Sequence, residues 1–220
     1  MVKITLHKIE MKRSRQESSG CERNTKRIQI SSVKLAVERN DIKELKRLLD
    51  AGADVRADNN HALICASQNA RVELVSLLLK NGTNIHAWDD YALKSASYKG
   101  HVEVVSLLLK NGADVHDHDD YALYLASKNG HVEVVSLLLK NGANVHAEDD
   151  YAEDDCALRR ASKNGHVEVV SLLLNFGANP EKCPKEMLDK VKADVRTILE
   201  VTQLPKCLKD NIIRPMLIGY

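Results

Sequence analysis

One segment of thirteen residues constrains this chain more than any other feature, because it is repeated. The sequence HVEVVSLLLKNGA occurs at residues 101–113 and again, letter for letter, at 131–143. It returns with two substitutions at 166–178, and a more divergent copy fills 71–83. A structural unit copied along a chain predicts a solenoid, in which each unit packs only against its neighbours.

Glycines give the length of the repeat. Four of them recur at steps of 30 residues and a fifth follows 35 residues later: Gly52, Gly82, Gly112, Gly142 and Gly177. These positions predict an array over residues 31–180, with an arm at 1–30 and a C-terminal segment at 181–220. The predicted units are 31–56, 57–86, 87–116, 117–146 and 147–180.

Each unit is predicted to form two short helices, so the expected fold class is all-α. In the unit at 87–116, Asp90 stands where a helix N-cap belongs and Gly100 where that helix ends. The helix that follows is apolar except for one polar stripe, so it needs neighbours on several sides, and stacked copies of itself supply them. We therefore expect second helices at 102–110, 132–140 and 167–174.

The pattern GHxEVVxLLLxxGADV resembles the second half of an ankyrin repeat, and ALxxAS stands where that repeat has its first helix. The resemblance implies an ankyrin-type α-solenoid with a C-terminal capping helix. The ankyrin family has a 33-residue period and a T-P-L-H opening to helix one, whereas this chain has a 30-residue period and D-D-Y-A-L. We expect Asp to take over the capping. The shortened repeats resemble those of giant amoeba-infecting DNA viruses and imply short finger loops.

The bulk composition argues against several classes of function. A formal net charge of +1 gives no global attraction to nucleic acid or to membranes. No apolar run approaches transmembrane length, and the N-terminus lacks the apolar core of a signal peptide. The five cysteines form no C-x-x-C pair, which suits reduced thiols. We therefore expect a monomer inside the cell, cytoplasmic or nuclear.

The segments outside the array differ from it. Residues 1–30 are polar and basic and predict a disordered arm, with a nuclear-import signal as the alternative. After Pro184 the sequence predicts a helix that covers the apolar face of the last repeat. Its apolar face would comprise Met187, Leu188, Val191, Val195, Ile198 and Leu199.

A short motif in the C-terminal segment offers a second interpretation. It resembles the second motif of the SOCS box, which follows ankyrin repeats in a family of ubiquitin-ligase adaptors. Poxviral ankyrin proteins likewise end in an F-box-like tail. The first SOCS motif would have Cys where Val191 stands, and the spacing between the two motifs is short. The residues that carry the resemblance are Leu204, Pro205, Leu208, Lys209, Asp210 and Ile212.

No catalytic or cofactor motif is recognisable, so we predict a protein that is not an enzyme and holds no cofactor or metal. Asp pairs recur at 89–90, 119–120, 149–150 and 154–155, where helix capping explains them better than calcium binding does. His86, His116 and His146 recur one repeat apart, too far to share a metal. His101, His131 and His166 begin second helices and are interpreted as structural.

Function is expected where the copies differ. In the ankyrin family the corresponding finger and inner-helix positions build a concave face that binds proteins, and aromatic residues and Arg are enriched at interface hot spots. The candidate binding residues are Trp88, Tyr98, His118, Tyr124, Arg159 and Arg160. Drift among recent duplicates remains the alternative. The predicted function is binding of a protein partner, the second candidate is a ubiquitin-ligase substrate adaptor, and nucleic-acid binding is disfavoured.

Overall fold

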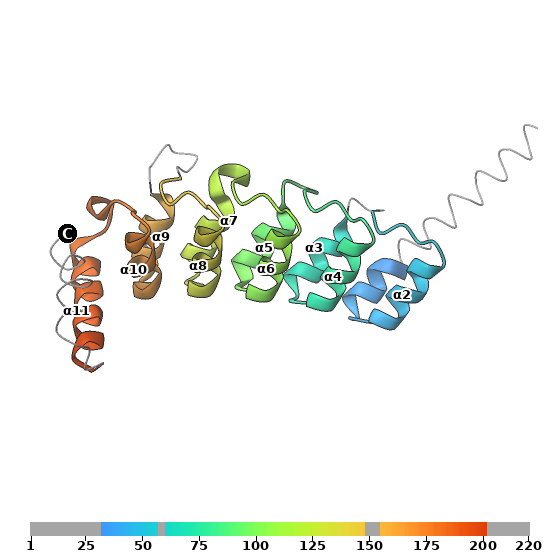
Figure 1. The fold of residues 1–220 in the computed structure, drawn as a ribbon, viewed down its shortest axis with the longest axis horizontal. Coiled ribbons are helices and arrows are strands. Elements are labelled where there is room, and N and C mark those ends of the chain that lie inside the picture. The colour runs from blue at the N-terminus through green and yellow to red at the C-terminus, as the bar shows by residue number, and fades with distance from the viewer. Residues whose placement is uncertain (1–31, 57–59, 148–154, 202–220) are drawn as a thin grey trace, which may run out of the picture.

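A computed structural model describes residues 32–56, 60–147 and 155–201, the stretch from residue 195 onward by its backbone alone. Every regular element in these residues is a helix, and the helices stand side by side in chain order along one long axis (Figure 1). The loops that join successive units gather at one edge of the row (Figure 1). The predicted all-α solenoid is confirmed.

Each unit from residue 60 onward contributes a first helix and a second helix. The first helices are α3 (His61–Gln68), α5 (Tyr91–Lys99), α7 (Asp117–Lys128) and α9 (Cys156–Asn164). The second helices are α4 (Val72–Lys80), α6 (Val102–Lys110), α8 (Val132–Lys140) and α10 (Val167–Asn175). Before them come the helical residues 32–38 and α2 (Ile42–Asp50), and after them the 3-10 turn η1 (Pro180–Lys182) and α11 (Lys185–Val201).

The helices form two layers, because first helices pack on first helices and second helices on second helices. The predicted second helices at 102–110 and 132–140 are confirmed, and the third ends one residue later than predicted. One leucine column through the second layer has no exposed surface: Leu78, Leu108, Leu138 and Leu173. In the first layer a column of equally buried alanines lets the helices approach closely: Ala66, Ala96, Ala126 and Ala161.

The predicted capping role is wrong for Asp90 and Asp155. Asp90 precedes α5 but accepts no hydrogen bond from its first turn. An N-cap residue needs an extended backbone to aim its side chain at the helix start, whereas Trp88, Asp89 and Asp90 all have left-handed φ, from 47° to 56°. His118, Asp119 and Asp120 repeat this conformation, which is uncommon for residues other than glycine.

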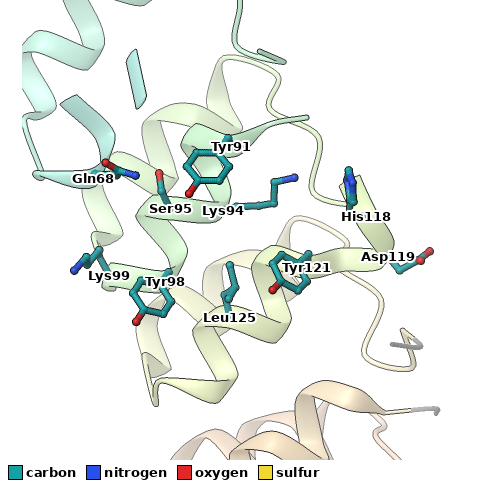
Figure 2. Close-up of a pocket in the computed structure, with 10 residues that line it drawn as sticks. All are labelled: Gln68, Tyr91, Lys94, Ser95, Tyr98, Lys99, His118, Asp119, Tyr121 and Leu125. Atoms are coloured by element: carbon teal, nitrogen blue, oxygen red, sulfur yellow. The ribbon is translucent and has the colours of Figure 1, made fainter. Parts of the chain in front are cut away.

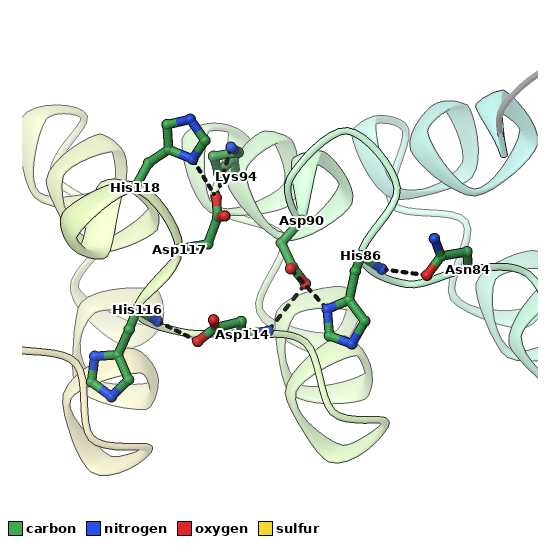
Figure 3. Close-up of polar contacts among 8 residues, drawn as sticks. All are labelled: Asn84, His86, Asp90, Lys94, Asp114, His116, Asp117 and His118. Atoms are coloured by element: carbon green, nitrogen blue, oxygen red, sulfur yellow. Dashed lines mark hydrogen bonds and ion pairs between the residues drawn. The ribbon is translucent and has the colours of Figure 1, made fainter.

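The buried aspartates instead join neighbouring repeats. The carboxylate of Asp90 accepts from His86 Nδ1 at 2.9 Å and from the backbone N–H of Asp114, in the loop of the next repeat, at 3.0 Å (Figure 3). We call this arrangement the aspartate clasp. Asp120 and Asp155 form the same clasp with equivalent partners, and in all three cases the backbone donor lies 24 residues further along. At the first joint Asn60 accepts from the backbone N–H of Asn84 at 2.7 Å.

A second tie joins the repeats through histidines at the start of the second helices. His131 Nε2 donates to the carbonyl of Tyr98 at 2.9 Å, and His101 and His166 make equivalent bonds to Gln68 and Lys128. Their predicted structural role is confirmed. The ring of His131 lies directly over Gly100, where an added Cβ would come within 2.6 Å of Nδ1.

The C-terminal helix closes the end of the array. Helix α11 packs against α10, with Met187 buried and Leu188 and Val191 partly buried against the core. Beside it the thiol of Cys183 lies 3.3 Å from Ser162 Oγ, and burial raises the pKa of that thiol. The side chains of Val195, Ile198 and Leu199, the arm at 1–30 and the motif at 204–212 lie outside the described residues. The boundaries between repeats stay a prediction.

Candidate protein-binding surface

The first helices present an open side, which we call the first-helix face. Successive repeats place equivalent residues there side by side, because each first helix packs on the next. One row of this face comprises Gln68, Tyr98, Lys128 and Lys163, and another comprises Ile64, Lys94, Tyr124 and Arg159. The side chains in each row differ in size, polarity or charge, except that Lys128 and Lys163 are alike.

A groove of about 610 Å³ lies on this face between α5 and α7. Figure 2 shows the aromatic rings of Tyr91 and Tyr98 from α5 and of Tyr121 from α7 around it. These three tyrosines are 46%, 45% and 44% exposed. The other residues that line the groove are Gln68, Lys94, Ser95, Lys99, His118, Asp119 and Leu125.

An ion pair fixes one end of the groove. Lys94 Nζ lies 2.8 Å from Asp117 Oδ2, and both side chains are largely buried (Figure 3). His118 Nδ1 lies 3.0 Å from the same carboxylate. The turn that begins α7 is thereby tied to the preceding first helix, so Lys94 serves to position the groove and its charge is already paired.

Tyr124 links the groove to the next repeat. Its ring stacks on Tyr121, with centroids 5.3 Å apart and planes inclined by 15°. The guanidinium of Arg160, from α9, lies 5.7 Å from the Tyr124 ring, and Lys128 Nζ lies 5.9 Å from it. Such cation–π contacts hold long cationic side chains close to an aromatic surface.

The structure separates the predicted binding residues into three places. Tyr98 and His118 line the groove, and Tyr124 and Arg160 meet beside it. Arg159 is partly buried on α9. Trp88 is 62% exposed, stands at the tip of the loop before α5, and is not among the residues that line the groove. Their role in binding stays a prediction.

The sequence reasoning missed Tyr91 and Tyr121. Both copies of D-Y-A-L carry this tyrosine, and identity between copies is typical of positions that hold the repeat together, whereas binding residues were expected where the copies differ. Helical spacing was the available signal, because Tyr91 is seven residues before Tyr98 and therefore lies on the same face of α5.

The described residues contain no group of three His, Cys, Asp or Glu side chains that could hold a metal ion. His86, His116 and His146 each pair with a different aspartate. Among the same residues, no helix is both long enough and apolar enough to cross a membrane. The groove on this surface is lined by aromatic, apolar and charged side chains.

Comparison with protein families agrees with this architecture. The family model that describes three copies of the ankyrin repeat matches residues 33–119 and, in a second overlapping match, residues 93–183. Together the two matches span more than half of the chain. A search of curated proteins gives no match. The repeated unit, the two helical layers and this family match lead to one conclusion: the chain belongs to the ankyrin-repeat family.

Proposed function

We propose that this chain binds a protein partner on the first-helix face, with the groove between α5 and α7 at the centre of the interface. The observation that carries the proposal is the set of three half-exposed tyrosines around one groove. Ankyrin repeats are generally protein–protein interaction modules, which supports the same conclusion.

The residue types suit the role. Tyrosine offers a large contact area with only two rotatable side-chain bonds, so ordering it on binding costs little entropy. A pocket with aromatic walls and a few polar groups is the usual seat for an anchoring side chain of a partner. In the groove, Leu125 adds apolar surface, and Asp119 and Lys99 supply polar groups at its edge.

The proposal is tested with the double variant Tyr98→Ala/Tyr121→Ala. Each truncation of an anchor is expected to cost about 1–3 kcal/mol of binding free energy, while melting stays close to that of the parent because both rings are half-exposed. Affinity purification should then lose the partners that the parent recovers. Phe176→Ala is the matched control, since Phe176 is an equally exposed aromatic at the end of α10, away from the groove. Partners retained by a well-folded double variant would contradict the proposal.

A second candidate, a substrate adaptor of a ubiquitin ligase, rests on the motif at 204–212. The test is deletion of residues 202–220, which leaves α11 and its contact with α10 in place. Ubiquitin-ligase subunits recovered with the full chain and lost with the deletion would favour the adaptor. Partners recovered equally with both chains would favour a plain binding module.

We further propose that the chain acts as a monomer in the cytoplasm or nucleus, without nucleic acid or membrane as a partner. Its shortened repeats support a place among the arrays of giant amoeba-infecting DNA viruses. Size-exclusion chromatography with light scattering tests the monomer, and a fluorescent fusion tests the location.

A further inference from the structure

The charges of this array are divided between its two layers. The regular turns of the first helices, residues 61–68, 91–99, 121–128 and 156–164, contain no Asp or Glu. They carry six cationic residues: Lys94, Lys99, Lys128, Arg159, Arg160 and Lys163. The second helices α4, α6, α8 and α10 carry three lysines and four glutamates, so they are close to neutral. These helical turns of the first layer are therefore basic in a chain whose formal net charge is only +1, while Asp117 and Asp119 lie in the turn that precedes residue 121.

The positive charge is greatest in the C-terminal repeat, because α9 carries three cationic residues, whereas α5 carries Lys94 and Lys99 and α7 carries Lys128. Helix α3 has no charged residue, and the charge of Lys94 on α5 is paired with Asp117. Lys128 on α7 and Lys163 on α9 are exposed neighbours in one row. Arg160 belongs to α9, and its guanidinium lies over the ring of Tyr124 on α7. The face thus has an aromatic groove at α5 and α7 and a cationic region at α7 and α9.

We propose that this face binds an acidic segment of a partner protein, with one apolar side chain in the groove and carboxylates over the cationic region. The inference rests on the proposed function and adds the chemistry of the partner to it. Carboxylates beside the exposed Lys128 and Lys163 and the partly buried Arg160 would steer the encounter and fix the orientation of the bound segment. A basic or neutral segment would gain no electrostatic binding free energy from these cationic side chains.

The spacing of the helices sets the spacing in the partner. Packed helices lie about 8–10 Å apart, so the middle of the cationic region, between α7 and α9, lies about 8–10 Å from the centre of the groove, and α9 itself lies about 12–15 Å from it. An extended chain advances about 3.3 Å per residue. The carboxylates are therefore expected about three to five residues from the apolar anchor, on the side toward α9, while Lys99 places one cation at the groove itself.

Nucleic acid is the other polyanion that could meet such a face, and one observation favours the acidic protein segment. Among the described residues Asp119 interrupts the cationic side chains at the groove, whereas a nucleic-acid site tracks the phosphates along its whole length with a continuous basic groove. Single-stranded DNA therefore serves as a competing probe in the test.

The experiment selects binders from a displayed library of random twelve-residue peptides, with the full chain as bait. The expected winners carry Asp or Glu three to five residues to one side of an aromatic residue or Leu. Their affinity for Lys128→Glu/Lys163→Glu should fall about tenfold or more and should weaken with added salt. Lys110→Glu/Lys140→Glu is the matched control, because it makes the same charge change at exposed helix ends of the second layer, and its affinity should stay within twofold.

Several results would overturn this inference. Selected peptides that are neutral or basic, or no selected peptide at all, would refute the acidic partner. If the double variant Tyr98→Ala/Tyr121→Ala loses the partners of the parent, the proposed function stands even when the acidic partner is refuted. If that variant keeps its partners, both the proposed function and this inference fail. An equal loss in both lysine pairs would place the effect in net charge rather than in the face. A twelve-nucleotide oligothymidine that binds more tightly than the best peptide would assign the face to nucleic acid.

Discussion

The second helices of neighbouring repeats are copies of one another, whereas the first helices are not. Helices α6 and α8 share the nine residues VEVVSLLLK. Residues 91–99 and 121–129 differ at four positions, which in α5 are Lys94, Ser95, Tyr98 and Lys99. All four of these residues line the groove.

Packing accounts for the difference between the layers. Val104, Val105 and Leu108 of α6 are sealed between α4 and α8, so a change there creates a cavity or a clash. The first helices meet one another through small alanines, pack against the second helices and leave one side open. Substitutions on that open side are expected to cost little stability. Both layers therefore carry stability at their buried positions, and the open side of the first layer is where the copies can differ.

The largest expected effect breaks the second layer. Leu138→Asp puts a charge at a site with no exposed surface, and desolvation should cost several kcal/mol, enough to unfold the neighbouring repeats. Ser136→Asp introduces the same carboxylate on the partly exposed stripe of the same helix and should cost less than about 1 kcal/mol. Thermal melts followed by circular dichroism measure both. Coincident melting curves for Leu138→Asp and the parent would refute the stabilising role of this buried position.

A smaller effect is expected at the clasp that joins the repeats. Asp120→Ala removes the acceptor for His116 and for the backbone N–H of Asn144, at a cost of about 2–3 kcal/mol. Asp120→Asn should cost less than about 1 kcal/mol, because Asn60 already makes the backbone bond with an amide at the first joint. Urea denaturation ranks the two variants. If Asp120→Ala were as stable as the parent, the clasp would contribute nothing to stacking.

The histidines that begin the second helices allow a comparison of two glycines that share a left-handed backbone conformation. Gly100→Ala places a Cβ against the ring of His131, whereas Gly142→Ala enters open space, and both positions have left-handed φ. The backbone strain of alanine at a left-handed φ is common to both variants and amounts to about 1 kcal/mol. The clash with His131 should therefore destabilise Gly100→Ala by about 1–2 kcal/mol more than Gly142→Ala. Denaturation midpoints measure the difference. Equal midpoints would mean that His131 moves aside without cost.

The bounds of the second helices could be predicted because apolar spacing and a glycine stop are local signals. The role of Asp90 could not, since it depends on a left-handed backbone and on a donor 24 residues away in the next repeat. Sequence identity between copies identified the framework correctly in α6 and α8. It misled at Tyr91 and Tyr121, which are identical in both copies and yet half-exposed in the groove.

The smallest expected effect concerns Trp88, in the loop before α5. Trp88, Asp89 and Asp90 form a run of left-handed residues, a conformation that costs any side chain except glycine about 1 kcal/mol or more. Trp88→Gly should therefore be more stable than Trp88→Ala by about 0.5–1 kcal/mol, since alanine keeps the strain and glycine releases it. Differential scanning calorimetry on the two variants measures this gap, and both have lost the same exposed ring. An alanine variant as stable as the glycine variant would mean that the tip stores no strain.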